Sequence, residues 1–114
     1  MNRSLLLQDA GKASGGAANE DLELGRVPEG EEWELTHIAV EDETTAFTSV
    51  RLGVRRGVAF IPLEEHVGGV AGELYTANRP FYLQAGNILV ARFVGTTSGD
   101  LLRLYANGLA YHMG

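Results

Sequence analysis

Hydrophobic and polar residues alternate with a period of two over much of the chain. In residues 46–55, Val50, Leu52 and Val54 fall on one face, and most of the residues between them are polar or glycine. This period is typical of a β-strand, whose successive side chains point to opposite faces. Residues 21–27 repeat the pattern, and no stretch sustains the 3.6-residue period of a helix. The pattern therefore predicts an all-β protein.

The strand that begins at the single tryptophan carries two apolar sets that are out of phase. Trp33 and Leu35 point to one face, whereas Ile38 and Val40 point to the other. A one-residue β-bulge near residues 36–37 would bring both sets onto the same face. We therefore expect a bulged central strand with the tryptophan in the core.

The remaining segments complete the set of predicted strands. Residues 88–94 are nearly all apolar, which indicates a central strand, whereas Pro62 favours an edge strand for residues 58–63. We expect residues 64–72 to form a loop. Residues 101–113 contain Asn-Gly, a common hairpin pair, but we favour one long strand with a bulge.

Turn signals recur every 8–12 residues and separate about eight predicted strands. Most of the 15 glycines lie at these turns. Many short, evenly spaced strands are typical of a sandwich or barrel. We predict an antiparallel jelly-roll-like β-sandwich.

The chain of 114 residues is long enough for one domain and too short for two. We expect residues 20–114 to form the sandwich and residues 1–19 to form a flexible arm with Leu5, Leu6 and Leu7 near its tip. Exposed leucines lower solubility unless a neighbour covers them, so the tip could dock on another subunit. A frayed terminus, or a first strand that returns to its own sheet, remains an alternative.

Composition excludes several classes of partner. The net charge of −6 argues against nucleic acid, whose phosphates require a basic surface. No stretch approaches the roughly 20 apolar residues of a membrane span, and the first residues do not resemble a signal peptide. The absence of cysteine removes disulfides and thiolate sites. We expect a protein made in the cytoplasm that binds neither nucleic acid nor membrane.

Charge is segregated along the chain. Residues 20–43 hold ten acids and one base, whereas residues 51–103 hold six arginines and four acids. This pattern indicates either two solvated faces or an acidic region that meets the arginines of the next subunit. Under the second hypothesis the candidate interface residues are Leu5, Leu6, Leu7, Glu31, Glu32, Glu34, Arg51, Arg55, Arg56 and Arg79.

The sequence contains no recognisable catalytic or metal-binding motif. Its three histidines, His37, His66 and His112, are dispersed, without the clustered pair of a cupin-type metal site. The only compact titratable cluster is residues 64–66, Glu-Glu-His, which we interpret as a solvated loop. There is no nucleophile elbow or phosphate loop either. We therefore expect a protein that is not an enzyme and has no cofactor or metal.

Three tyrosines are candidates for an exposed face: Tyr75, Tyr82 and Tyr105. Exposed tyrosines serve protein interfaces or sugar sites. A carbohydrate-binding β-sandwich is therefore the alternative to an assembly protein.

Three turn-to-strand segments carry a resemblance to a known group of proteins. They are Val-Pro-x-Gly-x-x-Trp-x-Leu at 27–35, Phe-Tyr-Leu-x-Ala-Gly-Asn-x-Leu-x-Ala at 81–91, and Ser-Gly-Asp-x-Leu-x-Leu from 98 with a closing Gly and Tyr by 111. Together they resemble small jelly-roll virion proteins of tailed bacteriophages, of the capsid decoration, head-fibre, neck or tail accessory type. The resemblance implies a structural role in the virion, assembly with copies of itself as a trimer or ring, and contact with a major capsid or other virion protein.

Overall fold

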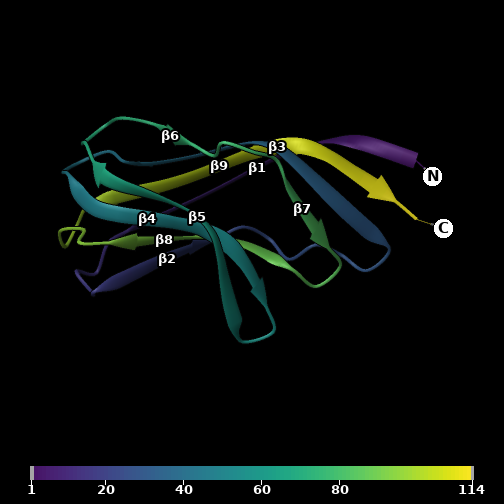
Figure 1. Cartoon of the computed structure of the whole chain (residues 1–114), viewed down its shortest axis with the longest axis horizontal. Coiled ribbons are helices and arrows are strands. Elements are labelled where there is room, and N and C mark those ends of the chain that lie inside the picture. Colours follow the sequence, from purple (N-terminus) through teal and green to yellow (C-terminus); the bar gives the residue numbers. More distant parts are fainter. Residues whose placement is uncertain (1, 114) are drawn as a thin grey trace.

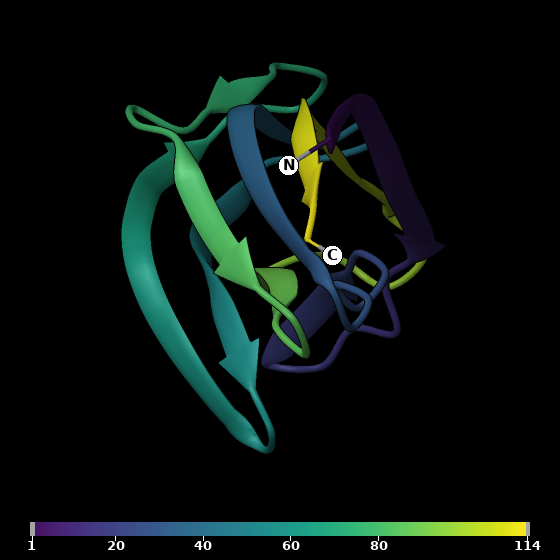
Figure 2. The ribbon, with the colours of Figure 1, turned by 90° about the vertical axis from the view of Figure 1, so that its right-hand side faces the viewer.

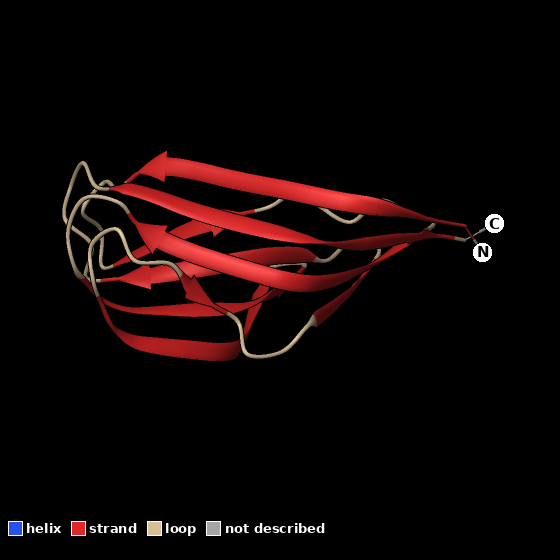
Figure 3. Cartoon of the chain, turned by 90° about the horizontal axis from the view of Figure 1, so that it is seen from above, coloured by secondary structure: helices blue, strands red, loops and turns tan. Residues whose placement is uncertain are grey.

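A computed structural model describes residues 2–113, which form nine β-strands in two antiparallel sheets. The strands are β1 (Asn2–Ala13), β2 (Asn19–Glu23), β3 (Glu31–Asp42), β4 (Phe47–Arg56), β5 (Ala59–Gly69), β6 (Tyr75–Thr76), β7 (Phe81–Gln84), β8 (Ile88–Val94) and β9 (Leu101–His112). Figure 3 shows strands joined by loops, with both termini at one tip. Between residues 2 and 113 there is no helix of the length and hydrophobicity that crossing a membrane requires.

The two sheets have the strand order of a jelly roll. Sheet A runs β1-β9-β3-β6, and β7 also pairs with β3. Sheet B runs β2-β8-β4-β5. The first and last strands are therefore neighbours in sheet A, and the chain passes repeatedly between the sheets, as in double-sheet jelly rolls (Figure 1). The predicted all-β sandwich is confirmed, with nine strands in place of about eight.

The core lies between the inner faces of the sheets. Every second residue of a strand points to this inner face, and these residues are mostly apolar. Trp33 is 4% exposed and packs among residues of both sheets, as predicted. Phe47 makes edge-to-face contact with Phe93 at 5.3 Å between ring centroids. The largest fully buried side chains are Phe93, Leu35, Ile38, Leu52, Leu83, Leu89, Leu102, Leu104, Val27, Val40, Val50 and Val90.

The predicted bulge in β3 is confirmed. Leu35 lies opposite Gly108 and His37 lies opposite Asn107, so Thr36 is the extra residue. The shift turns the second apolar set inward, and both sets are buried. The strands approach closely at this point, because a Cβ on Gly108 would lie 1.8 Å from the carbonyl oxygen of Glu34. A glycine is therefore required where the bulge meets β9.

The expected flexible arm over residues 1–19 is wrong for most of its length. Residues 2–13 form β1, which pairs with β9 from Asn2–His112 to Ala13–Leu101. The alternative of a first strand returning to its own sheet is the one observed. Glycine content argued against a helix there but not against a strand, and β9 supplies a partner of equal length. Leu6 and Ala10 pack against the core.

Residues 64–72 differ from the expected loop, because β5 continues to Gly69 and pairs with β4 throughout. Pro62 sits at a register shift in this edge strand, where a missing N–H is tolerated. The prediction of a central strand over residues 88–94 is confirmed, since β8 lies between β2 and β4. Residues 101–112 form one strand, and the bulge lies opposite it in β3.

Candidate binding surface

The outer face of sheet A carries an exposed row of leucines near the termini. Leu5 and Leu7 on β1 are 90% and 81% exposed, and Leu109 lies opposite Leu5 on β9. Alternation along β1 forces these side chains outward while Leu6 points to the core. We call Leu5, Leu7 and Leu109 the leucine row. A folded monomer leaves Leu5 and Leu7 uncovered and Leu109 partly buried, and all three lie on regular strands rather than on a tether.

The edge of sheet B is also apolar. Along the β4–β5 turn and β5, Val58, Ile61, Leu63 and Val67 are exposed to solvent. β5 pairs only with β4 in the described part of the chain, so its other edge has no strand partner, although Glu64 binds the Asn78 N–H there. Natural sandwiches usually protect such edges with charges, prolines or covering loops. Apolar edges on both sheets are thus a surface feature that the fold of a monomer does not explain.

An open groove of about 500 Å³ separates β7 from the β4–β5 hairpin. Tyr82 and Gln84 of β7 line one wall, and Ile61 and Leu63 of β5 line the other. Tyr82 is 70% exposed because its strand alternates between the core and solvent. The groove therefore offers an aromatic ring and an apolar wall to a ligand or partner.

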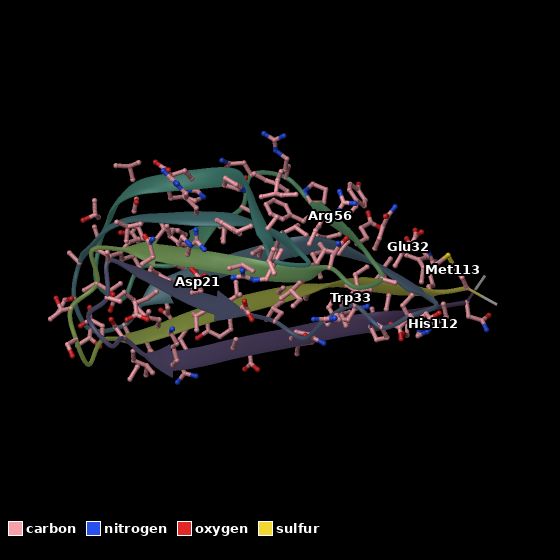
Figure 4. The ribbon with its side chains drawn as sticks, turned by 90° about the horizontal axis from the view of Figure 1, so that it is seen from below. Asp21, Glu32, Trp33, Arg56, His112 and Met113 are labelled. Carbon is pink, nitrogen blue, oxygen red and sulfur yellow. The ribbon has the colours of Figure 1, made fainter. Side chains whose placement is uncertain are left out.

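Polar groups complete the same groove. Figure 4 shows Glu32 and Arg56 toward the same end of the sandwich as Trp33, and all three residues line the groove. Within residues 2–113, no side-chain hydrogen bond or ion pair occupies Glu32 or Arg56. An unpaired carboxylate and an unpaired guanidinium can bind polar groups of an incoming molecule.

The three tyrosine candidates do not form one patch. Tyr82 is exposed in the groove, as expected. Tyr75 is partly buried, and its hydroxyl accepts a hydrogen bond from the Val70 N–H at 2.7 Å. Tyr105 is partly buried and donates to Glu41 at 2.9 Å. Only Tyr82 is free to offer its ring face to a partner.

Several arginines neutralise the acidic region within the same chain. Arg55 pairs with Asp21 at 3.0 Å and with Glu23 at 2.8 Å. Arg92 also binds Asp21 at 2.8 Å, and its guanidinium holds the pKa of that carboxyl below its usual value. The side chain of Asp21 lies on β2, beside β8 (Figure 4). Thus the segregated charges meet across sheet B of one subunit, which the linear sequence did not reveal.

Most of the other candidate interface residues also bind partners within the same chain. Arg51 pairs with Glu65 at 2.7 Å across β4 and β5. Glu31 accepts a hydrogen bond from the Trp33 indole at 3.1 Å and lies 3.8 Å from His112. Arg79 is exposed in the segment before β7. Glu34 accepts a hydrogen bond from the Tyr111 hydroxyl at 2.9 Å. Contact of any of these residues with another subunit remains a prediction.

Asp42 and Asp100 form a buried acid pair at the end opposite the termini. Burial, followed by a hydrogen bond to Asp100, raises the pKa of Asp42. Burial opposes ionisation of Asp100 as well, but hydrogen bonds from Asp42, Thr45 and the Thr97 N–H together lower its pKa. Asp42 Oδ2 accepts no hydrogen bond from the described residues. If Asp42 is protonated and donates this proton to Asp100, its Oδ2 needs no donor of its own. The same hydrogen bond accounts for the raised pKa of Asp42 and the lowered pKa of Asp100.

Glu20 organises the loop that follows β1. Its carboxylate binds Lys12 Nζ at 2.9 Å and accepts hydrogen bonds from the backbone N–H groups of Gly15 at 2.7 Å and Ala17 at 3.2 Å. The hydrogen bond from Lys12 is the largest cause that lowers the pKa of Glu20 to about 2. These contacts hold residues 14–18 against the sandwich and replace the loose tether that their composition suggested.

The Glu64–Glu65–His66 cluster lies on β5 rather than in a loop. His66 Nε2 lies 2.8 Å from Glu64, whose carboxylate also accepts from the Asn78 N–H at 3.0 Å. Glu65 points to the other face of the strand and pairs with Arg51. No group of three or more metal-ligating side chains occurs among residues 2–113. The cluster fastens the segment before β7 to the edge of sheet B.

These features place the chain in the class of two-sheet antiparallel β-sandwich proteins. Among solved structures it is similar to the N-terminal cellulose-binding domain of β-1,4-glucanase C from Cellulomonas fimi, with 13% sequence identity and a TM-score of 0.40. The match covers 93% of this chain and 78% of that chain. No protein-family profile and no curated protein sequence matches the chain. The likeness concerns the fold alone, and these comparisons supply no evidence for a phage family.

The sequence predicted an edge strand at Pro62 but neither its continuation to Gly69 nor the groove. The groove joins residues from β3, β4, β5, β7 and β9, which are distant in the sequence. The exposed apolar residues of β5 had one available signal, because a proline-containing segment favours an edge. The glycines and charged residues of residues 64–72 favour a loop in the sequence, so the second half of the edge strand has no local signal of its own.

Proposed function

We propose that this chain is a non-catalytic assembly protein that binds other protein subunits through the apolar edges of its two sheets. The observation that carries the proposal is the exposure of Leu5 and Leu7 on a regular edge strand. Exposed apolar residues in such a row mark protein–protein contact sites in soluble proteins. The open edge of β5, with its own apolar side chains, supports the same function.

The specific role we propose is that of an accessory protein of a tailed-bacteriophage virion, such as a capsid decoration protein. It would be made in the host cytoplasm and carried on the particle with copies of itself and a major capsid or other virion protein. The resemblance of residues 27–35, 81–91 and 98–111 to such proteins supports this role, and the jelly-roll strand order is compatible with it.

Light scattering over a wide range of protein concentrations tests the assembly function. The wild-type chain should show a mass above the 12.3 kDa of one chain as its concentration rises. Serine at Leu5 and Leu7, or at Val58 and Val67, should weaken association at the corresponding edge. Leu74→Ser is the matched control, because Leu74 is exposed in the loop before β6 and lies on neither edge.

Mass spectrometry of virus particles purified from the source tests the specific role. The chain should be present at a fixed ratio to the major capsid protein. Its absence from the particles would contradict the virion role. A chain that is also monomeric at every concentration would contradict the assembly function itself.

A second candidate function is glycan binding in the groove. Tyr82 exposes its ring beside the unpaired groups Glu32 and Arg56, and sugars bind to such combinations of ring face and polar groups. A glycan array should then give hits that Tyr82→Ala loses and Tyr82→Phe retains, since phenylalanine keeps the stacking ring. An array without hits would remove this candidate.

A further inference from the structure

The outer edge of β1 is a twelve-residue strand edge without a neighbour. β1 pairs with β9 on one side and has no strand on the other in the described part of the chain. Apart from the ladder to β9, no backbone hydrogen bond within residues 2–113 involves residues 2–13. Figure 2 looks along the molecule and shows β1, in purple, at the border of the ribbon. An open edge of this length can pair with a strand of another chain.

The sequence of β1 is complementary to itself when read in the opposite direction. It runs Arg-Ser-Leu-Leu-Leu-Gln-Asp over residues 3–9. If Leu6 lies opposite Leu6 of a second copy in antiparallel pairing, Leu5 faces Leu7. In the same register Arg3 faces Asp9 of the second copy. Each pair occurs twice, as a two-fold axis requires.

The neighbouring registers lack this match. Residues directly opposite each other in a strand pair project from the same side of the sheet. An allowed change of register must therefore keep outward-pointing residues of one strand opposite outward-pointing residues of the other. With Leu5 opposite Leu5, Arg3 would face Leu7. With Leu7 opposite Leu7, Leu5 would face Asp9. Both arrangements place a charge against a leucine, so pairing centred on Leu6 is favoured.

The side chains involved already lie on one face of the sheet. Arg3, Leu5, Leu7 and Asp9 are all exposed, in alternation with the partly buried Leu6 and Gln8. Leu5 lies beside Leu109 of β9. Pairing of two copies would therefore extend the leucine row across the new strand pair, with an arginine–aspartate pair on each flank.

We propose that two copies of this chain associate through antiparallel pairing of β1 about a two-fold axis at Leu6. Their sheets A join into one continuous sheet, and each copy covers Leu5 and Leu7 of the other. The inference rests on the proposed assembly function and names one partner of that assembly, a second copy of the chain. It leaves the edge of β5 and the groove free for other contacts.

Cysteine cross-linking tests the register. Residues directly opposite each other in an antiparallel pair have Cα atoms roughly 4.5–5.5 Å apart, within the range that a disulfide spans. Because the chain has no cysteine, a variant with both Leu5→Cys and Leu7→Cys should form a disulfide-linked dimer under mild oxidation. Leu5→Cys alone is the control, since Leu5 of the two copies would lie on a diagonal beyond disulfide reach.

Charge exchange tests the same register without relying on oxidation. Arg3→Asp should place two acids opposite each other and weaken the dimer by roughly tenfold, and Asp9→Arg should do so with two bases. The double variant should restore the dimer toward the wild-type affinity. A structural effect of either change within one chain would persist in the double variant, so the recovery is specific to pairing between copies.

The outcomes separate this inference from the function on which it rests. Cross-linking of the two-cysteine variant, with recovery in the charge-exchanged double variant, supports pairing at Leu6. An oligomer that shows neither effect overturns the inference but leaves the assembly function in place. A wild-type chain that is monomeric at all concentrations overturns the inference, and its presence or absence in virus particles then decides the assembly function.

Discussion

Replacing Glu20 by glutamine tests how firmly the loop after β1 is held. The carboxylate is buried and makes three polar contacts of 3.2 Å or less, with Lys12, Gly15 and Ala17. Glutamine has nearly the same size and keeps one oxygen acceptor, but it removes the charge. Hydrogen bonds to a charged group contribute roughly 1 kcal/mol more than neutral ones, and such contributions are not additive. We therefore expect the variant to lose about 2 kcal/mol of unfolding free energy at neutral pH.

The pH dependence gives this prediction a distinctive signature. The pKa of Glu20 falls from an ordinary 4.5 to about 2 on folding. Its contribution to stability is thus complete above pH 4.5 and is lost as the pH falls toward 2. The wild-type protein should be more stable than Glu20→Gln at pH 7, and the difference should shrink progressively below pH 4.5.

Urea denaturation followed by Trp33 fluorescence measures this difference over the pH range. At neutral pH the variant should also melt roughly 6–12 °C lower, given about 3–6 °C per kcal/mol for a chain of this size. Glu29→Gln is the matched control, because Glu29 is exposed and makes no side-chain hydrogen bond or ion pair among residues 2–113. Equal stability of Glu20→Gln and the wild type, or a difference that does not change with pH, would refute this account of the loop.

Three further predictions concern the buried acid pair, the bulge and the core. The wild type should lose stability as the pH rises above 3.8, because the proton on Asp42 is then lost. Asp42→Asn should abolish this loss, because an amide keeps a donor toward Asp100 at every pH. An unchanged pH profile in urea denaturation would contradict the shared proton. Gly108→Ala should cost at least about 1–3 kcal/mol. Gly11→Ala should cost less, because its new Cβ would meet the flexible Arg103 side chain at 3.3 Å and come no closer than 3.5 Å to backbone. Equal melting temperatures of the two variants would argue against the close approach at Gly108. Trp33→Ala should lower the unfolding free energy by about 3–5 kcal/mol, whereas Tyr82→Ala on the exposed face should lower it little. A melting temperature that falls more for Tyr82→Ala than for Trp33→Ala would place the tryptophan at the surface.

The sequence predicted those parts of the fold that local alternation encodes. The bulge between Leu35 and His37 could be placed because two apolar sets with opposite phase must share one core. The interior position of β8 followed from its nearly continuous apolar composition. Trp33 was predicted to be buried because it lies in phase with Leu35.

The errors arose where long-range pairing decides the structure. Residues 2–13 form a strand because β9, about a hundred positions away, provides a matching edge, and their own composition does not reveal it. Likewise, the arginines of β4 and β8 meet Asp21 only because β2 pairs with β8. The groove at Tyr82 depends on five strands, so its shape could not be derived from any one segment.

The central claim is that apolar strand edges of this sandwich serve association with other protein chains. Hydrogen–deuterium exchange of the wild-type protein at low and high concentration tests it most directly, because backbone amides at an open edge exchange until another chain covers them. The account predicts that amides of β1 or β5 become protected as the concentration rises, while those of the central strands β4 and β8 do not change. Exchange at both edges that is identical at every concentration would contradict association of the chain with its own copies through these edges.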